Sequence, residues 1–234
     1  MIFKKVLDKK IWKIILPILG GVIVVVLLSV GLMKYYHHSQ NNNQNLETIQ
    51  VDLTPQQRTD LQNKISSYLD LLKAYPNSFQ TRLDLGMAQA GLGNIGLAKQ
   101  YLQESLKYIS NNPTDYLNLA DDFRQLKDYD QAYNIFWQAQ KADPKYELTY
   151  QQIVDFYTWY YPQKQSDIES VYLLGIKELG NNQQGLKKSL AAYYIDHGRY
   201  KESIPLLEDT LKLYPNDLWC LQQLRIAKEK TGTK

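Results

Sequence analysis

Hydrophobic and polar positions follow three different patterns along the 234-residue chain. Residues 14–33 form an apolar run without a single charge, whereas residues 38–45 are almost entirely polar. From about residue 54 onward, apolar side chains return every three or four positions, which is the spacing of one face of an α-helix. The chain therefore divides into an apolar segment, a polar connection and a helical domain.

The apolar run predicts a helix that crosses a lipid bilayer. A helix over residues 14–33, at about 1.5 Å per residue, is about 30 Å long and matches the hydrocarbon thickness of a membrane. A cleaved signal peptide is the alternative, but its apolar core is usually about 7–15 residues long and ends in small residues, a pattern that Ser29, Val30 and Gly31 match poorly. We therefore expect a transmembrane helix over residues 14–34, after a basic tail over residues 1–13.

Lysines are distributed unevenly around this segment and predict its orientation. Five lysines precede the apolar run and one follows it. Because lysines resist transfer across the bilayer, the N-terminus should stay in the cytoplasm and the rest of the chain should lie outside it. We interpret the chain as a single-pass protein of a bacterial cell membrane. Residues 35–53 would then form a flexible polar linker, of which residues 38–53 have a root-mean-square reach on the order of 20 Å.

A helix start signal follows the linker. Thr54 can cap a helix, Pro55 suits its first turn, and Gln57 can complete a capping box with Thr54. Pro76 should stop that helix, because proline cannot continue a helix interior. We therefore expect a single flanking helix within residues 54–78 that ends a few residues before Pro76.

From residue 79 the sequence resembles itself at a spacing of 34 residues (120 − 86 = 34 and 132 − 98 = 34). Gly86 corresponds to Ala120 at this interval, and Ala98 corresponds to Ala132. Each unit has the pattern of two amphipathic helices joined by a short turn, which predicts a row of stacked helix pairs. The units span residues 79–112, 113–146, 147–183 and 184–217, and a capping helix with a tail follows over residues 218–234.

The units resemble the tetratricopeptide repeat (TPR) family. The residues that carry the resemblance alternate large and small side chains in the order of that motif. In the second unit they are Tyr116, Leu119, Ala120, Phe123, Tyr129, Ala132, Phe136, Ala139 and Pro144, and in the fourth unit they are Leu190, Ala191, Tyr194, Gly198, Tyr200, Ser203, Leu207, Thr210 and Pro215. The resemblance implies an all-α fold: a right-handed α–α superhelix of about four repeats with flanking helices.

Small residues should lie where the two helices of each unit meet, because they let the helix axes approach closely. In the first unit, Gln89 stands where an aromatic residue is usual in the motif, so we expect looser packing there. The small residues are Gly86, Ala120 and Ala191 on the first helices, and Ala98, Ala132 and Ser203 on the second helices.

Two prolines and the C-terminal segment depart from the simple pattern. Pro162 should end the first helix of the third unit. Pro205 should lie in the first turns of a helix, where a missing N–H costs little. Near the C-terminus, Leu218, Leu221 and Leu224 share one helical face, and we expect them to cover the last hydrophobic surface of the row.

Residues suited to chemistry are sparse. The chain has one cysteine, Cys220, and three histidines, which excludes an intrachain disulfide and a Cys–His zinc cluster. Over residues 35–234 acidic side chains slightly outnumber basic ones, a balance that argues against nucleic acid as a partner. No catalytic or phosphate-binding motif occurs in the sequence. We expect a protein without catalytic activity, cofactor or metal.

By the TPR resemblance, the first helices of the units line a concave groove. Only Arg124 and Lys188 are basic among the expected lining residues, so we do not predict a clamp for a C-terminal carboxylate. The consecutive aromatic residues 159–161 either anchor a partner or pack the irregular third unit. The expected groove residues are Leu83, Met87, Leu117, Asp121, Arg124, Gln125, Gln151, Asp155, Trp159, Lys188 and Ala192.

These features favour a scaffold without catalytic activity that holds a protein or peptide near a membrane. The groove would bind the partner, and residues 14–34 would contact the lipid bilayer. The alternative is a chaperone-like holdase for chains that emerge at the membrane or at secretion machinery. A holdase would bind many unfolded segments weakly, whereas a scaffold would prefer one partner.

Overall fold

A computed structural model describes residues 47–180 and 183–233 of the chain. Gln50–Lys234 form one compact unit, called here the helical domain. The transmembrane helix expected over residues 14–34 and the basic tail over residues 1–13 lie outside the described residues. Within the described ranges, no helix is both long enough and apolar enough to span a bilayer.

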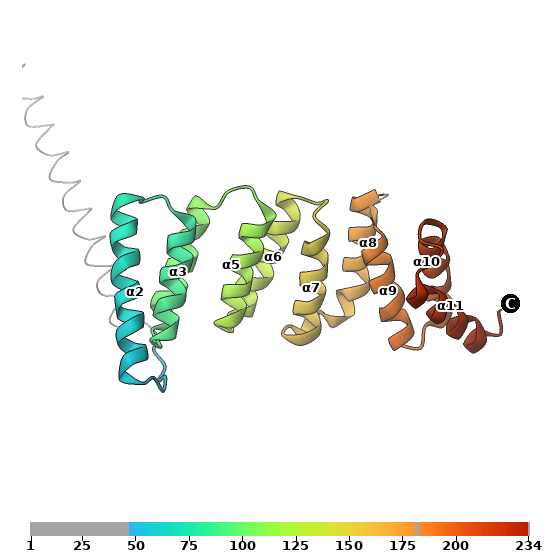
Figure 1. Cartoon of the computed structure of the whole chain (residues 1–234), viewed down its shortest axis with the longest axis horizontal. Helices are drawn as coiled ribbons and strands as arrows, with labels where there is room; N and C mark the ends of the chain where they lie inside the picture. The colour runs from blue at the N-terminus through green and yellow to red at the C-terminus, as the bar shows by residue number, and fades with distance from the viewer. Residues whose placement is uncertain (1–46, 181–182, 234) are drawn as a thin grey trace, which may run out of the picture. The chain divides into compact units, whose positions relative to one another are not determined.

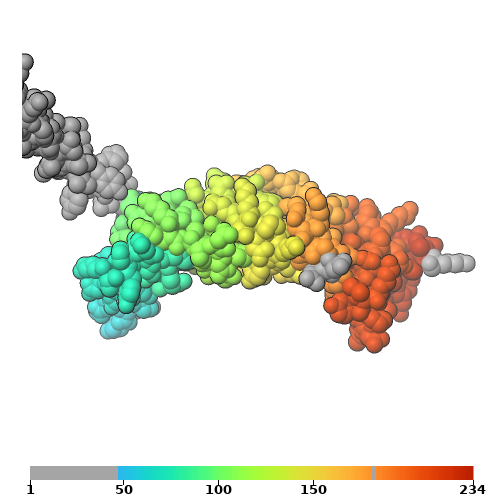
Figure 2. Space-filling view, turned by 90° about the horizontal axis from the view of Figure 1, so that it is seen from above, coloured from blue at the N-terminus to red at the C-terminus, as the bar shows by residue number. Residues whose placement is uncertain are grey.

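All regular structure in the described part of the chain is helical, as the sequence predicts. Ten α-helices follow one another there in a row (Figure 1), and the row is curved (Figure 2). The α-helices are α2 (Pro55–Ala74), α3 (Phe79–Gly91), α4 (Ile95–Ser105), α5 (Pro113–Gln125), α6 (Tyr129–Ala142), α7 (Glu147–Trp159), α8 (Ile168–Leu179), α9 (Gln184–Asp196), α10 (Tyr200–Leu213) and α11 (Leu218–Thr231). Two short 3₁₀ helices, η1 (Leu106–Tyr108) and η2 (Pro162–Asp167), extend α4 and precede α8.

Consecutive helices pack against each other in pairs. The helices pair as α3 with α4, α5 with α6, α7 with α8, and α9 with α10, while α2 and α11 cover the two ends of the row. The first helices of successive pairs also touch, because α3 contacts α5, α5 contacts α7, and α7 contacts α9. The first helices therefore form one continuous layer of the domain.

Local signals in the sequence set several helix ends. The predicted capping box of α2 is confirmed: the backbone N–H of Gln57 donates to Thr54 Oγ1 at 3.2 Å, and the backbone N–H of Thr54 donates to Gln57 Oε1 at 2.9 Å. The predicted end of α7 before Pro162 is also confirmed, since α7 stops at Trp159. Pro162 then opens η2, a 3₁₀ helix that the repeat pattern did not predict.

The small residues lie in the predicted contacts. Gly86 is buried, and a Cβ atom added there would lie 3.0 Å from Leu102 Cδ2 of the paired helix. Close packing of the two helix axes therefore needs a small residue at this position. Five further positions in this set are fully buried: Ala98, Ala120, Ala132, Ala191 and Ser203.

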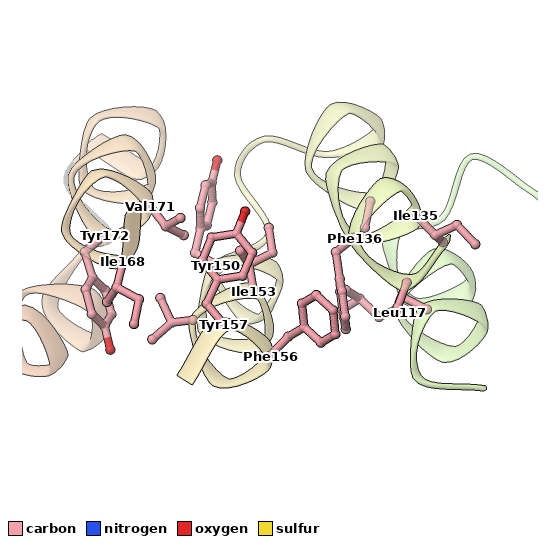
Figure 3. Close-up of a cluster of buried hydrophobic side chains, with 14 of the residues drawn as sticks. Leu117, Ile135, Phe136, Tyr150, Ile153, Phe156, Tyr157, Ile168, Val171 and Tyr172 are labelled. Atoms are coloured by element: carbon pink, nitrogen blue, oxygen red, sulfur yellow. The ribbon is translucent and has the colours of Figure 1, made fainter. Parts of the chain in front are cut away.

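Helix α7 supplies the centre of the main hydrophobic core (Figure 3). Its side chain Phe156 lies 5.2 Å, between ring centroids, from Phe136 of α6. Tyr150 and Tyr157 are fully buried, and their hydroxyl groups are hydrogen-bonded: Tyr150 donates to the Pro144 carbonyl at 2.6 Å, and Trp137 Nε1 donates to Tyr157 at 2.9 Å. Buried tyrosines are tolerated in this core because each polar end has a partner.

Gln89 and Pro205 are two of the positions at which the sequence departs from the repeat pattern. Gln89 is buried, and its side-chain oxygen accepts a hydrogen bond from Asn94 Nδ2 at 2.8 Å, in the turn between α3 and α4. The looser packing expected in the first unit stays a prediction. Pro205 lies inside α10, more than one turn beyond its first residue, Tyr200. Its missing N–H would have donated to the carbonyl of residue 201, so the expectation of a nearly free position is wrong.

The prediction that Leu218, Leu221 and Leu224 together cover the end of the row is also wrong. In α11, Leu218 is 80% exposed and Leu221 is 45% exposed, whereas Cys220 and Ala227 are fully buried. The helix turns its small residues inward because they let it approach α10, and Leu224 packs beside them. Two of the three leucines therefore face solvent.

We predict that Gly175→Ala destabilises the domain. An added Cβ would lie 2.8 Å from Tyr150 Cγ and closer still to Leu186, both of which are fully buried. We expect a loss of about 1–3 kcal/mol in the free energy of unfolding, although alanine in a helix gains about 1 kcal/mol over glycine. Chemical denaturation would measure the change in the free energy of unfolding. Lys177→Ala, at an exposed position of the same helix, is the control, and equal stabilities of the two variants would refute the close contact.

Candidate functional site

Two adjacent hollows lie along the first helices of the second, third and fourth pairs. The first is about 500 Å³ and lies mainly between α5 and α7, and the second is about 450 Å³ and lies mainly between α7 and α9. Asp155 and Trp159 of α7 line both hollows. We call the two hollows together the α5–α7–α9 groove, and it is the candidate functional site.

Trp159 separates the two hollows and is 75% exposed. It is the last residue of α7, and the helix ends there with the backbone N–H of Tyr160 donating to the Phe156 carbonyl at 2.9 Å. Because Pro162 prevents the helix from continuing, the chain turns away directly after Trp159. The indole ring is therefore left in the groove rather than in the core.

The two tyrosines after Trp159 have structural contacts. The ring of Tyr161 stacks on Phe156 with centroids 5.2 Å apart, and its hydroxyl donates to Asp130 at 2.5 Å. The guanidinium of Arg124 lies 4.5 Å from the ring centroid of Tyr160. Tyr161 thus packs within the third unit, whereas Trp159 is exposed, and its role as an anchor for a partner stays a prediction.

The two basic residues expected in the groove are already paired within the domain. Arg124 Nε donates to Asp121 at 2.6 Å, and this hydrogen bond raises the pKa of Arg124. Lys188 Nζ donates to Asp217 at 2.6 Å, which raises the pKa of Lys188, and it lies 5.5 Å from the ring centroid of Trp219. Both cations thus already have a carboxylate partner within the domain.

Two carboxylates of the second hollow have no such partner. Asp155 and Asp196 both line it, and neither forms an ion pair with any residue in the described ranges. Loss of hydration raises the pKa of Asp155, because no nearby cation offsets the cost of removing water from its charge. The groove therefore carries uncompensated negative charge.

The structure brings together only some of the residues expected to line the groove. Leu83 is buried in the core, Met87 packs against it, and Gln151 donates to Glu147 at 3.0 Å without lining either hollow. Gln125 is exposed and donates to Asp121 at 2.9 Å. The structure places Leu117, Asp121, Arg124, Asp155 and Trp159 in the first hollow, Asp155, Trp159 and Ala192 in the second, and Lys188 with Ala192 in a shallow depression beside Trp219.

Among the polar lining residues that sequence reasoning missed, Asn118, Gln152 and Ser189 lie on the first helices α5, α7 and α9. Each directly follows an expected residue (Leu117, Gln151 or Lys188) and lies about one helical turn before another (Asp121, Asp155 or Ala192). Asn118 and Gln152 also occupy the same position in successive units of the repeat. This correspondence is the signal that could have found them.

Two other residue types with reactive side chains are a buried cysteine and a histidine at the edge of the groove. The thiol of Cys220 is buried, and burial raises its pKa to about 11, as suits a space-filling residue. His197 is exposed at the rim of the second hollow, with Nδ1 2.7 Å from the Tyr193 carbonyl oxygen. Across residues 47–180 and 183–233, no group of three potential metal ligands occurs.

Comparisons with known proteins support the fold. No protein-family model and no curated protein matches the chain. The solved C-terminal part of a TPR repeat-containing protein from Cytophaga hutchinsonii is 17% identical, with 68% of this chain and 65% of that chain covered and a TM-score of 0.50. MamA is 20% identical, with 70% and 95% covered and a TM-score of 0.46. The thermophilic TPR protein TTC0263 from Thermus thermophilus is 18% identical, with 70% and 88% covered and a TM-score of 0.41.

At these identities the likeness concerns the fold alone. The similarity to the Cytophaga hutchinsonii structure, together with the helix pairs seen here, gives the helical domain a TPR-like fold. The implied all-α superhelix of paired helices is therefore confirmed for the described residues.

We predict that Asp122→Asn stabilises the domain most at alkaline pH. Burial, and then the charges of Asp121 and Asp84, raise the pKa of Asp122 to about 7. The folded state thus binds this proton more tightly than the unfolded state, so stability falls as the pH rises from about 4 to about 7 and the carboxylate must ionise in place.

Melting temperatures at pH 5 and pH 8 would test this effect. The asparagine variant should gain about 1–3 kcal/mol over the parent at pH 8 and clearly less at pH 5. Asp60→Asn on the exposed face of α2 is the control. The same gain at both pH values would contradict the raised pKa.

Proposed function

We propose that the helical domain binds a segment of a partner polypeptide in the α5–α7–α9 groove and performs no catalysis. The observation that carries this proposal is Trp159, which is 75% exposed between two hollows. A large aromatic side chain held in a concave surface supplies apolar contact area at little entropic cost, which is why such residues dominate binding energy in protein interfaces.

The groove suits an extended segment. Successive side chains of an extended chain alternate in direction, so they can enter hollows on either side of Trp159. Asn118, Gln152 and Ser189 offer hydrogen-bond donors and acceptors to the backbone of such a segment. The groove thus combines an apolar anchor with polar groups able to satisfy a peptide backbone.

The anchoring of the domain is a further part of the proposal. The uncharged run over residues 14–33 supports a membrane-spanning helix over residues 14–34, and the excess of lysines before it supports a cytoplasmic N-terminus. The helical domain would then lie outside the cytoplasm of a bacterial cell, held by a short polar linker. Tethering raises the effective concentration of the domain toward partners in the same membrane.

We predict that Trp159→Ala weakens capture of the partner without lowering the melting temperature. The indole is mostly exposed, so its removal should leave the core intact. In native membranes, crosslinking followed by mass spectrometry should recover the partner about tenfold less efficiently, which corresponds to a loss of about 1.4 kcal/mol.

The matched control is Tyr214→Ala, which removes an aromatic side chain that is 57% exposed outside the groove. Unchanged partner recovery with Trp159→Ala would contradict groove binding. Protection of many unfolded proteins from aggregation, in place of one recovered partner, would indicate a holdase instead of a scaffold.

We also predict that removal of residues 1–34 releases the protein from the membrane fraction. Only the apolar run is expected to insert into lipid, because the described helices do not meet the requirements for a bilayer span. Cell fractionation would measure the release. Protease added outside spheroplasts should cleave the helical domain of the full chain, and protection of that domain would show that the orientation is reversed.

A further inference from the structure

The second hollow has an apolar floor below an acidic rim. Val154, Ile168 and Ala192 contribute apolar atoms, and the rings of Tyr172 and Tyr193 extend that surface. Asp155 and Asp196 contribute the charge. A ligand group that matches both parts must be apolar along its length and cationic at its end, which describes the side chains of lysine and arginine.

The charges along the whole groove also favour a cationic ligand group. Three acidic residues and one arginine line the two hollows, and that arginine is bound to Asp121. Asp155 and Asp196 therefore remain the uncompensated charges in this part of the domain. These two carboxylates would repel an anionic ligand group, whereas they would attract a cation, whose charge would compensate theirs.

Trp159 adds a second attraction for a cation. Its indole lines the same hollow as the two carboxylates and is mostly exposed. The face of an indole ring attracts a nearby ammonium or guanidinium group, and tryptophan is the strongest of the aromatic residues in this respect. The domain already uses this type of contact, since Arg124 lies over Tyr160 and Arg199 lies over Tyr194 at 4.4 Å.

We propose that the second hollow is a subsite for a lysine or arginine side chain of the bound segment, with Asp155 and Asp196 as its counter-charges and Trp159 as its aromatic wall. This inference rests on the proposed function and specifies the partner: an extended segment with a basic residue at its centre. The first hollow shares Asp155 with the second, and its other two charged residues, Asp121 and Arg124, are paired with each other, so it takes a neighbouring side chain without a further charge requirement.

The test uses the full chain in lipid nanodiscs and four pools of short synthetic peptides. The pools have random flanking residues and a fixed central residue, which is arginine, citrulline, lysine or norleucine. Citrulline keeps the shape of arginine and norleucine keeps the stem of lysine, but neither is charged. We expect the arginine and lysine pools to be retained about tenfold better than their neutral counterparts.

Two variants show whether the named carboxylates cause this preference. Asp155→Asn and Asp196→Asn should each bring the ratio of charged to neutral peptides close to one, while retention of the neutral pools stays unchanged. Glu104→Gln removes an exposed carboxylate from α4 and should leave the ratio intact. Thermal unfolding of each variant would confirm that the fold is retained.

Each contrary result has a distinct meaning. Equal retention of charged and neutral pools would overturn the cationic subsite and leave the proposed peptide binding standing. A charge preference that survives both asparagine variants would also overturn it, because general attraction would then be the cause. Retention of no pool above that of empty nanodiscs would overturn the subsite and the proposed function together.

Discussion

Close approach of neighbouring helices at small buried residues is the constraint on which the rest of the domain depends. Gly86, Ala120 and Ala132 lie where paired helices meet, and Gly175 of α8 leaves room for the ring of Tyr150 from its paired helix α7. Since such contacts have no spare volume, each helix has one position relative to the next. The layer of first helices, and hence the groove, follows from this sequence of local contacts.

The third pair shows how an irregularity in the repeat generates a candidate site. Pro162 follows the end of α7, which has the same 13-residue length as α3, α5 and α9, and opens η2, so the irregularity lies in the connection to α8. Tyr161, which belongs to that connection, stacks on Phe156. Trp159, on the last turn of α7, has no place in that core and lies between the two hollows.

Internal ion pairs then decide which charges of the groove remain for a partner. Arg124 and Lys188 suggest an anion site when they are considered alone, but Asp121 and Asp217 bind them. Asp155 and Asp196 are left without cations among the described residues. The electrostatic character of the groove is thus set by pairs between side chains, and it is opposite to what its basic residues indicate.

The sequence by itself determined the class of the fold, because helical periodicity, the regular repeat spacing and the capping box of α2 can all be recognised from the order of residues along the chain. It also indicated about half of the groove, including Asp155 and Trp159. Only the tertiary structure decided that Leu83 is core, that Leu218 faces solvent and that Arg124 is neutralised. The phase of a helix against its neighbour and the choice of ion-pair partner depend on packing volumes and distances between residues far apart in the chain, and no pattern along one helix contains them.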